Sequence, residues 1–200
     1  MKNGLKISVF ILSGILAVWI LLTFWAEAKG PAKSTQMGNA ENMFNVLIVY
    51  DSDPIYNLDE QVCLRFGKTL AAAGIGVKVA TVAAVDTDSL DFDAYVFCAN
   101  TYNWRPDWAV TGLIQKAPIA NKPVIAITLG SGSTRDSQKA LERLIGEKKG
   151  TLRASKSFWL LRPNDESRME ESNVQVTLSM VEAWAGQLAK EWKTDGDRPR

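Results

Sequence analysis

The chain has 200 residues, of which 46% are hydrophobic and 22% charged, and its net charge is +1. This composition is typical of a globular protein with enough chain for one domain and its core. The first 41 residues carry four lysines against two glutamates, which leaves a charge of −1 on the remainder. No basic stripe is available to hold a phosphate backbone, so nucleic acid is excluded as an expected partner.

Histidine is absent from the sequence. Its absence removes the usual Ser-His and Cys-His nucleophile systems and the commonest ligand of transition metals. The two cysteines, Cys63 and Cys98, lie far apart and form no CxxC pair, so neither a zinc site nor a disulfide framework is indicated. We interpret both as buried apolar thiols.

The N-terminal segment Ile7–Ala26 contains twenty residues without a charge. At about 1.5 Å per residue, a helix of this length crosses a hydrocarbon core of about 30 Å. Trp25, near its end, suits an anchor at the membrane interface. We therefore predict a single-pass membrane anchor within residues 1–28.

The residues around this segment leave an alternative and an orientation to consider. Lys2 and Lys6 precede the apolar run and Ala26-Glu27-Ala28 resembles an A-x-A cleavage site, as in a signal peptide. The run is longer than the about 7–15 apolar residues typical of signal peptides, which favours a retained anchor. Two lysines flank each side of the apolar run, so the positive-inside rule hardly separates the two possible orientations. The short basic N-terminus favours a cytoplasmic N-terminus, and therefore a domain on the extracytoplasmic side.

Composition divides the rest of the chain into three parts. Residues 29–42 are rich in Gly, Pro, Ser, Asn and Lys, which is typical of a flexible spacer. The folded domain is expected over residues 43–193. Residues 194–200 are expected to form a disordered tail.

Strand and helix patterns alternate from residue 44 onward. Short runs that are apolar on both faces predict buried strands at 44–50, 77–82, 94–99, 124–129 and 152–161. Apolar spacing of three and four predicts helices after 57, after 106, after 133 and over 174–192, with a helical turn at 86–90. Asn57 with Glu60 resembles a capping box, and Pro106 suits the first turn of its helix.

This alternation predicts an α/β domain, a doubly wound three-layer sandwich around a parallel five-stranded sheet. In such folds the ligand lies beyond the carboxyl ends of the strands. The loops 51–57, 100–106 and 130–135 therefore form the candidate site.

With these loops in place, the domain resembles the flavodoxin-like family over residues 45–192. Residues 46–52, VLIVYDS, are similar to a flavodoxin first strand that enters its phosphate loop. Residues 99–106, ANTYNWRP, are similar to the G-S-P-x-Y-x-x-x-P loop that cups the flavin ring, with Tyr102 and Pro106 in register. The loops at 121–124 and 130–132 fall where the family places their counterparts. The resemblance implies the sheet order 2-1-3-4-5 and a site for flavin mononucleotide (FMN).

The resemblance also implies a function and a set of binding residues. The domain is expected to transfer electrons through FMN, with a redox protein or a membrane quinone as its partner and the membrane reached through the N-terminal helix. The residues implied to bind the flavin are Ser52, Asn57, Asn100, Thr101, Tyr102, Trp104, Gly130 and Gly132.

The first loop departs from the family pattern. The family's phosphate loop is typically [ST]-x-T-G-x-T, whereas residues 51–57 read DSDPIYN, with one such hydroxyl, no glycine and a proline that lacks an N–H. The carboxylates of Asp51 and Asp53 would also repel a dianionic phosphate. We therefore expect the flavin to be held more through its ring than through its phosphate.

Each of these features also has an ordinary structural explanation. Tyr102 and Trp104 can stack on a flavin ring or pack beside their own helix. Asp51 and Asp53 can act in acid-base chemistry or cation binding, or only favour the positive end of the next helix. The Gly-Ser loop after residue 129 can be a simple turn. The alternative functions are therefore a cofactor-free interaction or sensing module, and a quinone or porphyrinogen reductase of the same fold.

Overall fold

The computed structural model describes residues 2–39 and 44–196. The helices are α1 (Lys2–Ala26), α2 (Leu58–Ala72), α3 (Trp108–Lys116), α4 (Arg135–Glu147) and α5 (Asn173–Gly196). The strands are β1 (Ser34–Met37), β2 (Asn45–Tyr50), β3 (Gly76–Thr81), β4 (Ala94–Tyr102), β5 (Arg105–Pro106), β6 (Pro123–Gly130) and β7 (Thr151–Trp159). The predicted helical turn at 86–90 is confirmed as a short 3-10 helix, Thr87–Ser89.

The sheet confirms the predicted strand order. Strands β3, β2, β4, β6 and β7 lie side by side and run parallel, which is the order 2-1-3-4-5 of the five predicted strands. The structure adds β1, antiparallel to β3 at one edge, and the two-residue β5, antiparallel to β4. All five parallel strands therefore end at the same edge of the sheet.

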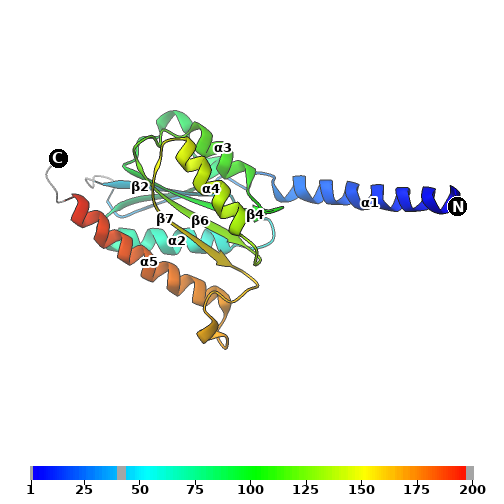
Figure 1. Cartoon of the computed structure of the whole chain (residues 1–200). Coiled ribbons are helices and arrows are strands. Elements are labelled where there is room, and N and C mark those ends of the chain that lie inside the picture. The colour runs from blue at the N-terminus through cyan, green and yellow to red at the C-terminus, as the bar shows by residue number, and fades with distance from the viewer. Residues whose placement is uncertain (1, 40–43, 197–200) are drawn as a thin grey trace.

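Helices cover both faces of the sheet, which confirms the three layers. Val46, Ile48 and Tyr50 of β2 belong to the core shared with α2 and α5. Leu47 and Val49 belong to the core shared with α3 and α4. Because successive side chains of a strand point to opposite faces, a strand covered on both sides is apolar at every position. Figure 1 shows α2 and α5 on one side of the sheet and α3 and α4 on the other.

The interior also accounts for both cysteines. Cys63 on α2 and Cys98 on β4 are free and fully buried. They lie in the same apolar core, between the sheet and the layer formed by α2 and α5. The prediction of two buried apolar thiols is confirmed.

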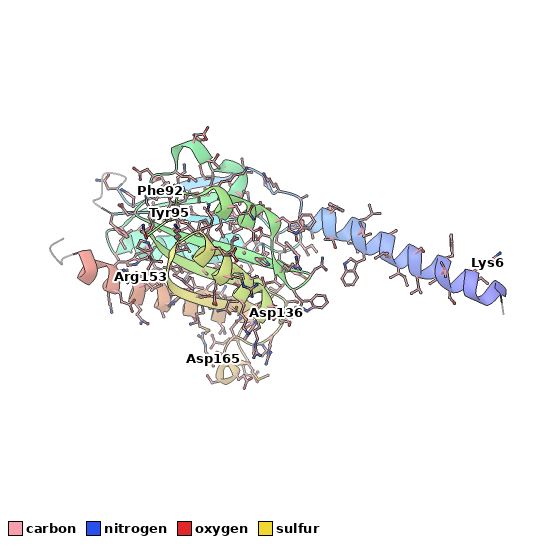
Figure 2. The ribbon with its side chains drawn as sticks, turned by 45° about the horizontal axis from the view of Figure 1, so that its top comes forward. Lys6, Phe92, Tyr95, Asp136, Arg153 and Asp165 are labelled. Carbon is pink, nitrogen blue, oxygen red and sulfur yellow. The ribbon has the colours of Figure 1, made fainter. Side chains whose placement is uncertain are left out.

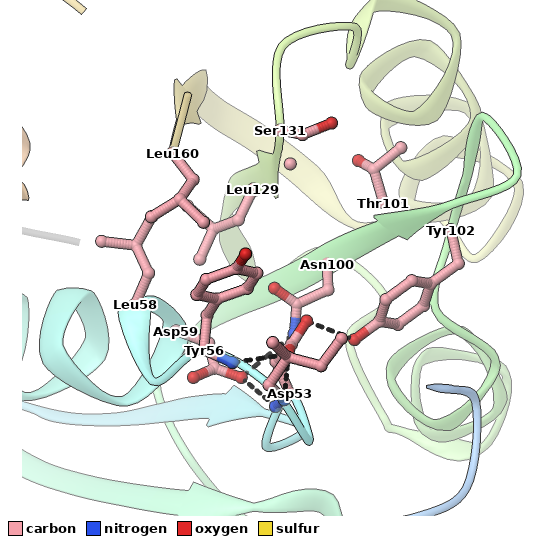
Figure 3. A pocket seen from close by; sticks show the side chains of 12 residues that line it. Asp53, Tyr56, Leu58, Asp59, Asn100, Thr101, Tyr102, Leu129, Ser131 and Leu160 are labelled. Carbon is pink, nitrogen blue, oxygen red and sulfur yellow. Dashed lines mark hydrogen bonds between the residues drawn. The ribbon is translucent and has the colours of Figure 1, made fainter. Parts of the chain in front are cut away.

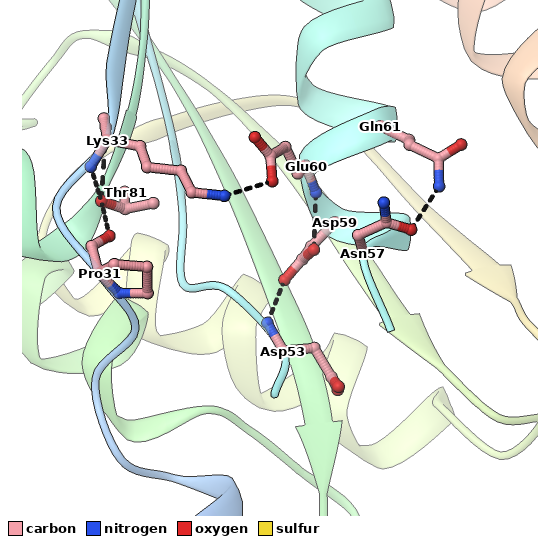
Figure 4. Close-up of polar contacts among 8 residues, drawn as sticks. All are labelled: Pro31, Lys33, Asp53, Asn57, Asp59, Glu60, Gln61 and Thr81. Carbon is pink, nitrogen blue, oxygen red and sulfur yellow. Dashed lines mark hydrogen bonds and ion pairs between the residues drawn. The ribbon is translucent and has the colours of Figure 1, made fainter. Parts of the chain in front are cut away.

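The connector between α1 and the sheet is ordered, which corrects the prediction of a flexible spacer over residues 29–42. The Lys33 N–H donates to Thr81 Oγ1 at 2.9 Å, and the Thr81 N–H donates to the Lys33 carbonyl at 2.9 Å. Lys33 Nζ also bonds to Glu60 Oε2 at 2.8 Å (Figure 4). The physical reason is that β3 would otherwise be an open edge, whose backbone groups β1 satisfies. Residues 40–42 of the predicted spacer, and residue 43 of the predicted domain, lie outside the described residues.

The C-terminal boundary also differs from the prediction. Helix α5 extends to Gly196, so residues 194–196 belong to the helix and not to a disordered tail. No proline or glycine interrupts the sequence between residues 187 and 195, and a helix without such a breaker continues. Residues 197–200 of the predicted tail lie outside the described residues.

Two helix starts differ from the prediction. Asn57 precedes α2, but its side chain makes no capping hydrogen bond, and its Oδ1 accepts from Gln61 Nε2 at 2.6 Å (Figure 4). Pro106 belongs to β5, and Asp107 caps α3 by accepting from the Val110 N–H at 2.7 Å. Pro106, which the sequence pattern assigned to the start of α3, instead belongs to the hairpin formed by β4 and β5.

Helix α1 projects from the end of the domain at which β4 ends (Figure 1). Residues Lys6–Ala26 form an apolar stretch of 21 residues, and none of its most apolar window is buried inside the protein. By length and composition this one helix is able to cross a membrane.

Candidate functional site

A cavity of about 230 Å³ lies at the carboxyl edge of the sheet. It is lined by five residues of the segment after β2 (Asp53, Ile55, Tyr56, Leu58 and Asp59), by the end of β4, by the end of β6 with Ser131, and by the residue that follows β7. The three loops chosen from the sequence therefore meet here, at the place where the topology of a parallel sheet puts a ligand.

The cavity has an apolar side and a polar side, as Figure 3 shows. Leu58, Leu129 and Leu160 gather on one side, and Tyr102 stands across from them beside Asp53. An apolar cavity with a few polar groups is the usual form of a small-molecule site.

Tyr102 borders the cavity from the end of β4. Its hydroxyl donates to Asp53 Oδ2 at 2.7 Å (Figure 3). Burial and this hydrogen bond to a carboxylate raise the pKa of Tyr102, so the hydroxyl keeps its proton. The bond fixes one edge of the aromatic ring and leaves the ring itself beside the cavity.

Thr101 lines the cavity. Its Oγ1 is buried and has no hydrogen-bond partner among the described residues, as is also the case for the hydroxyls of Ser52, Thr128 and Ser137. A buried hydroxyl without a partner costs about 1–3 kcal/mol. Gly130 lies close by, and a Cβ at this position would stand 2.7 Å from Thr134 Cγ2 and 3.1 Å from Thr101 Cβ. Only glycine fits between these two threonines without a shift.

Two carboxylates, one in the loop before α2 and one in its first turn, accept backbone hydrogen bonds. Asp53 Oδ1 accepts from the N–H groups of Ile55 and Tyr56 at 2.7 and 2.8 Å. Asp59 accepts from the N–H of Asp53 at 2.6 Å and from that of Glu60 at 2.7 Å (Figure 4). Backbone N–H groups at a helix N-terminus are the usual holders of a phosphate. Here the N–H of Glu60 in the first turn, and three N–H groups of the preceding loop, bond to carboxylates of the chain itself.

Asp59 lies beneath the cavity and is 1% exposed. Burial raises the pKa of Asp59 to about 6, against the opposing effect of its hydrogen bonds from Asn100 and two backbone N–H groups. Asn100 Nδ2 donates to Asp59 Oδ2 at 3.0 Å and to the Asp51 carbonyl at 3.1 Å. The Asn100 N–H donates to Asp107 Oδ2 at 2.9 Å. Asn100 therefore ties the ends of β2, α2 and α3 together.

Three more buried carboxylates lie at this edge of the sheet. Burial raises the pKa values of Glu27, Asp51 and Asp107, and repulsion from neighbouring carboxylates acts in the same direction on Glu27 and Asp107. Each accepts a backbone hydrogen bond, as Asp51 Oδ1 does from the Gly30 N–H at 3.1 Å. No group of three or more His, Cys, Asp or Glu residues able to hold a metal ion occurs within residues 2–39 and 44–196.

The structure of this chain matches solved structures with a probability of 1.00. The domain has the flavodoxin fold. It is similar to rubredoxin oxygen:oxidoreductase from Desulfovibrio gigas, with a TM-score of 0.62 and 17% identity over 77% of this chain. The match spans 37% of the length of that oxidoreductase.

Two flavodoxins match over nearly their whole length. A flavodoxin from the domain Archaea has a TM-score of 0.52 and 12% identity, over 74% of this chain and 99% of its own. The two-electron reduced flavodoxin of Megasphaera elsdenii has a TM-score of 0.51 and 13% identity, over 69% of this chain and 98% of its own. No protein-family model and no curated protein matches the sequence.

Within this flavodoxin fold, four of the eight residues implied by the resemblance line the cavity: Asn100, Thr101, Tyr102 and Gly130. They come from the ends of β4 and β6, whose parallel pairing brings them to one edge of the sheet.

The structure does not bring the other four to the cavity. Ser52 packs against the connector, where a Cβ on Gly30 would come within 2.8 Å of Ser52 Cβ. Asn57 is exposed and bonded to its own helix. Trp104 is 59% exposed at the tip of the β4–β5 hairpin, and Gly132 borders a separate hollow.

Four residues of the cavity lie outside the loops chosen from the sequence: Leu58, Asp59, Leu129 and Leu160. Leu58 has the spacing of a core residue, and Leu160 falls inside the predicted last strand. Asp59 has a signal in the sequence, because an acidic residue in the first turn of a helix is a candidate ligand of the free backbone N–H groups.

Proposed function

We propose that this cavity binds the ring system of a flavin and that the domain transfers electrons while α1 holds it at a membrane. The observation that carries the proposal is the largely apolar cavity beside Tyr102 at the carboxyl edge of a flavodoxin fold. A flat ring offers Tyr102 a stacking surface. A bound flavin would supply the electron-transfer chemistry.

The residues present fit the ring of a flavin but not its phosphate. The N–H groups of Ile55, Tyr56 and Glu60 already bond to carboxylates. A phosphate would have to displace Asp53 or Asp59 and then remain beside their charges, at a cost of about 1 kcal/mol or more for each charge. The volume of about 230 Å³ also falls below the about 300–1,000 Å³ of pockets that enclose a whole drug-sized ligand. FMN would therefore be held by its ring.

The same carboxylates bear on the potential of a bound flavin. Asp53 and Asp59 place negative charge at one side of the cavity. Negative charge disfavours an anionic form of the ring, so we expect a low reduction potential.

A ring-stacking variant tests the proposal. Tyr102→Ala removes one of the two aromatic side chains that line the cavity, so we expect riboflavin to bind about tenfold more weakly. Trp104→Ala is the matched control, because this aromatic residue lies in the same hairpin but does not line the cavity. Titration of the full chain in detergent with riboflavin, followed by quenching of flavin fluorescence, measures both variants. Absence of binding at high micromolar concentration would instead support the cofactor-free interaction or sensing module.

Membrane attachment is tested separately from flavin binding. We infer that α1 crosses the membrane once, with the domain on the extracytoplasmic side, and that it keeps the domain close to a redox protein or a membrane quinone. The full chain should stay in the membrane pellet after washing with alkaline carbonate. Release of the chain would contradict the anchor, and recovery of a chain beginning at Lys29 would identify a signal peptide.

A further inference from the structure

Helix α1 joins the domain at the same edge as the cavity. Asn103 Nδ2 donates to Thr23 Oγ1 at 3.0 Å. The Phe24 and Trp108 rings meet edge to face at 5.7 Å, and Glu27 Oε2 accepts from the Trp108 N–H at 2.7 Å. Because the apolar stretch ends at residue 26, these contacts place the β4–β5 hairpin beside the last turn of the span. A bilayer crossed by α1 therefore has its surface at this hairpin (Figure 1).

Exposed apolar side chains gather at this edge of the domain. Outside α1, the described residues include seven exposed large hydrophobic side chains, and five of them lie in segments next to the carboxyl ends of the strands. These five are Ile55, Tyr56, Trp104, Trp108 and Leu161. Leu161 is 74% exposed, although it directly follows a residue that lines the cavity. Such a concentration is more than the scattered exposed residues of an ordinary surface.

Trp104 is held at this edge in a conformation that its side chain disfavours. Asn103 and Trp104 form the two-residue turn of the hairpin, with φ angles of 48° and 62°. Asparagine tolerates the left-handed region, whereas a bulky residue rarely adopts it. Tryptophan is enriched where a protein meets the interface between membrane and water. The turn thus holds the exposed Trp104 directly after Asn103, which contacts the end of α1.

Besides the carboxylates described above, this edge carries basic residues around two hollows. Two hollows at this edge are bordered by the charged residues Arg105, Arg135, Asp136, Lys139, Arg143 and Arg162. In the part of the chain that the structure describes, none of the arginines 105, 135 and 162 forms an ion pair. Figure 2 shows Asp136, the acidic member, at the end of the domain nearest α1 and Arg153 toward the other end.

We propose that this edge rests on the surface of an anionic phospholipid bilayer. The surface, which we call the membrane face, is defined by Ile55, Trp104, Arg105, Trp108, Arg135 and Leu161. Apolar and aromatic side chains beside unpaired basic ones are the composition that binds the interface of an anionic membrane. This proposal rests on the crossing of the membrane by α1 proposed above.

The orientation has a consequence for access to the cavity. Ile55 both lines the cavity and belongs to the membrane face, so the mouth of the cavity opens toward the lipid surface. Thr101 and Tyr102 border the cavity and also a hollow against α1 lined by Trp19 and Leu22. The membrane face thus admits a small lipid-soluble electron carrier more readily than a large soluble protein.

A pair of leucines, one at each end of β7, tests the membrane face. Leu161 follows the carboxyl end of β7, and Leu152 lies at its amino end with 38% exposure. The full chain carrying Leu161→Cys or Leu152→Cys would be labelled with an environment-sensitive dye and placed in nanodiscs of phosphatidylcholine and phosphatidylglycerol. Wild type should take up no dye, because Cys63 and Cys98 are fully buried.

Nitroxide lipids labelled near the headgroup should quench the dye at position 161 at least about twofold more than at position 152. Arg135→Glu with Arg162→Glu should abolish this difference, whereas Lys148→Glu with Lys149→Glu, at the far end of α4, should preserve it. Equal quenching at the two positions would overturn the proposal. Equal effects of the two charge reversals would overturn the anionic preference.

The experiment distinguishes the membrane face from the two parts of the proposed function, which are flavin binding and the membrane anchor. A chain that does not enter nanodiscs refutes both the membrane anchor and the membrane face. A chain that binds no flavin but shows selective quenching at position 161 refutes flavin binding alone and supports the membrane face.

Discussion

Leu188→Ala should lower the free energy of unfolding of the domain by about 2–5 kcal/mol. Leu188 lies on α5, is 4% exposed and belongs to the same core as Phe66 and Leu70 of α2. Truncation to alanine leaves a cavity that a close-packed interior fills only in part. Urea unfolding of the full chain in detergent, followed by circular dichroism, measures the change.

An exposed leucine provides the comparison for this variant. Leu152→Ala removes the same atoms from the exposed start of β7 and should change the free energy of unfolding by less than about 1 kcal/mol. Equal effects of the two substitutions would contradict the packing of α5 on the sheet and with it one of the three layers.

The domain should lose stability as the pH rises through the pKa of Asp59. The pKa of this carboxyl is about 6 in the folded state, whereas the ordinary pKa of an aspartate, which the unfolded chain retains, is 3.8. A raised pKa means that the folded state binds the proton more tightly, so the stabilising contribution is complete below about pH 3.8 and is lost as the pH rises through about 6. The difference corresponds to about 3 kcal/mol in the free energy of unfolding.

Asp59→Asn isolates this contribution. Asparagine cannot titrate, so the decrease in the free energy of unfolding between about pH 4 and pH 7 should be about 2–3 kcal/mol smaller than in wild type. This comparison of slopes does not depend on the variant's stability at any single pH. Asp136→Asn, which changes an exposed carboxyl, is the control. Parallel pH profiles for wild type and Asp59→Asn would show that Asp59 does not titrate as its burial requires.

The parallel sheet was predictable because its strands are apolar on both faces. Val46, Ile48 and Tyr50 serve one core while Leu47 and Val49 serve the other, and this leaves an uninterrupted apolar run in the sequence. β1 gave no such signal, because its four residues, STQM, are mostly exposed. Its pairing follows from the open edge of β3, which exists only once the sheet has formed.

The place of the site was also predictable, but its chemistry was only partly so. Parallel strands end at one edge, so the loops after β2, β4 and β6 had to meet. Which atoms face the cavity depends on tertiary contacts that no local pattern contains. Ser52 turns to Gly30 of the connector, and Asp53 closes on backbone N–H groups two and three residues ahead.

The central claim is that the cavity binds the ring of a flavin, whereas the backbone N–H groups that would bind the FMN phosphate are already bonded to Asp53 and Asp59. The most direct measurement compares the dissociation constants of riboflavin and FMN for wild type and for Asp53→Thr. The claim predicts constants within about tenfold of each other for wild type, or about 1.4 kcal/mol. It also predicts that Asp53→Thr, which frees the N–H groups of Ile55 and Tyr56, improves the binding of FMN alone. A wild-type preference for FMN of about 100-fold or more, or an equal effect of Asp53→Thr on both ligands, would contradict it.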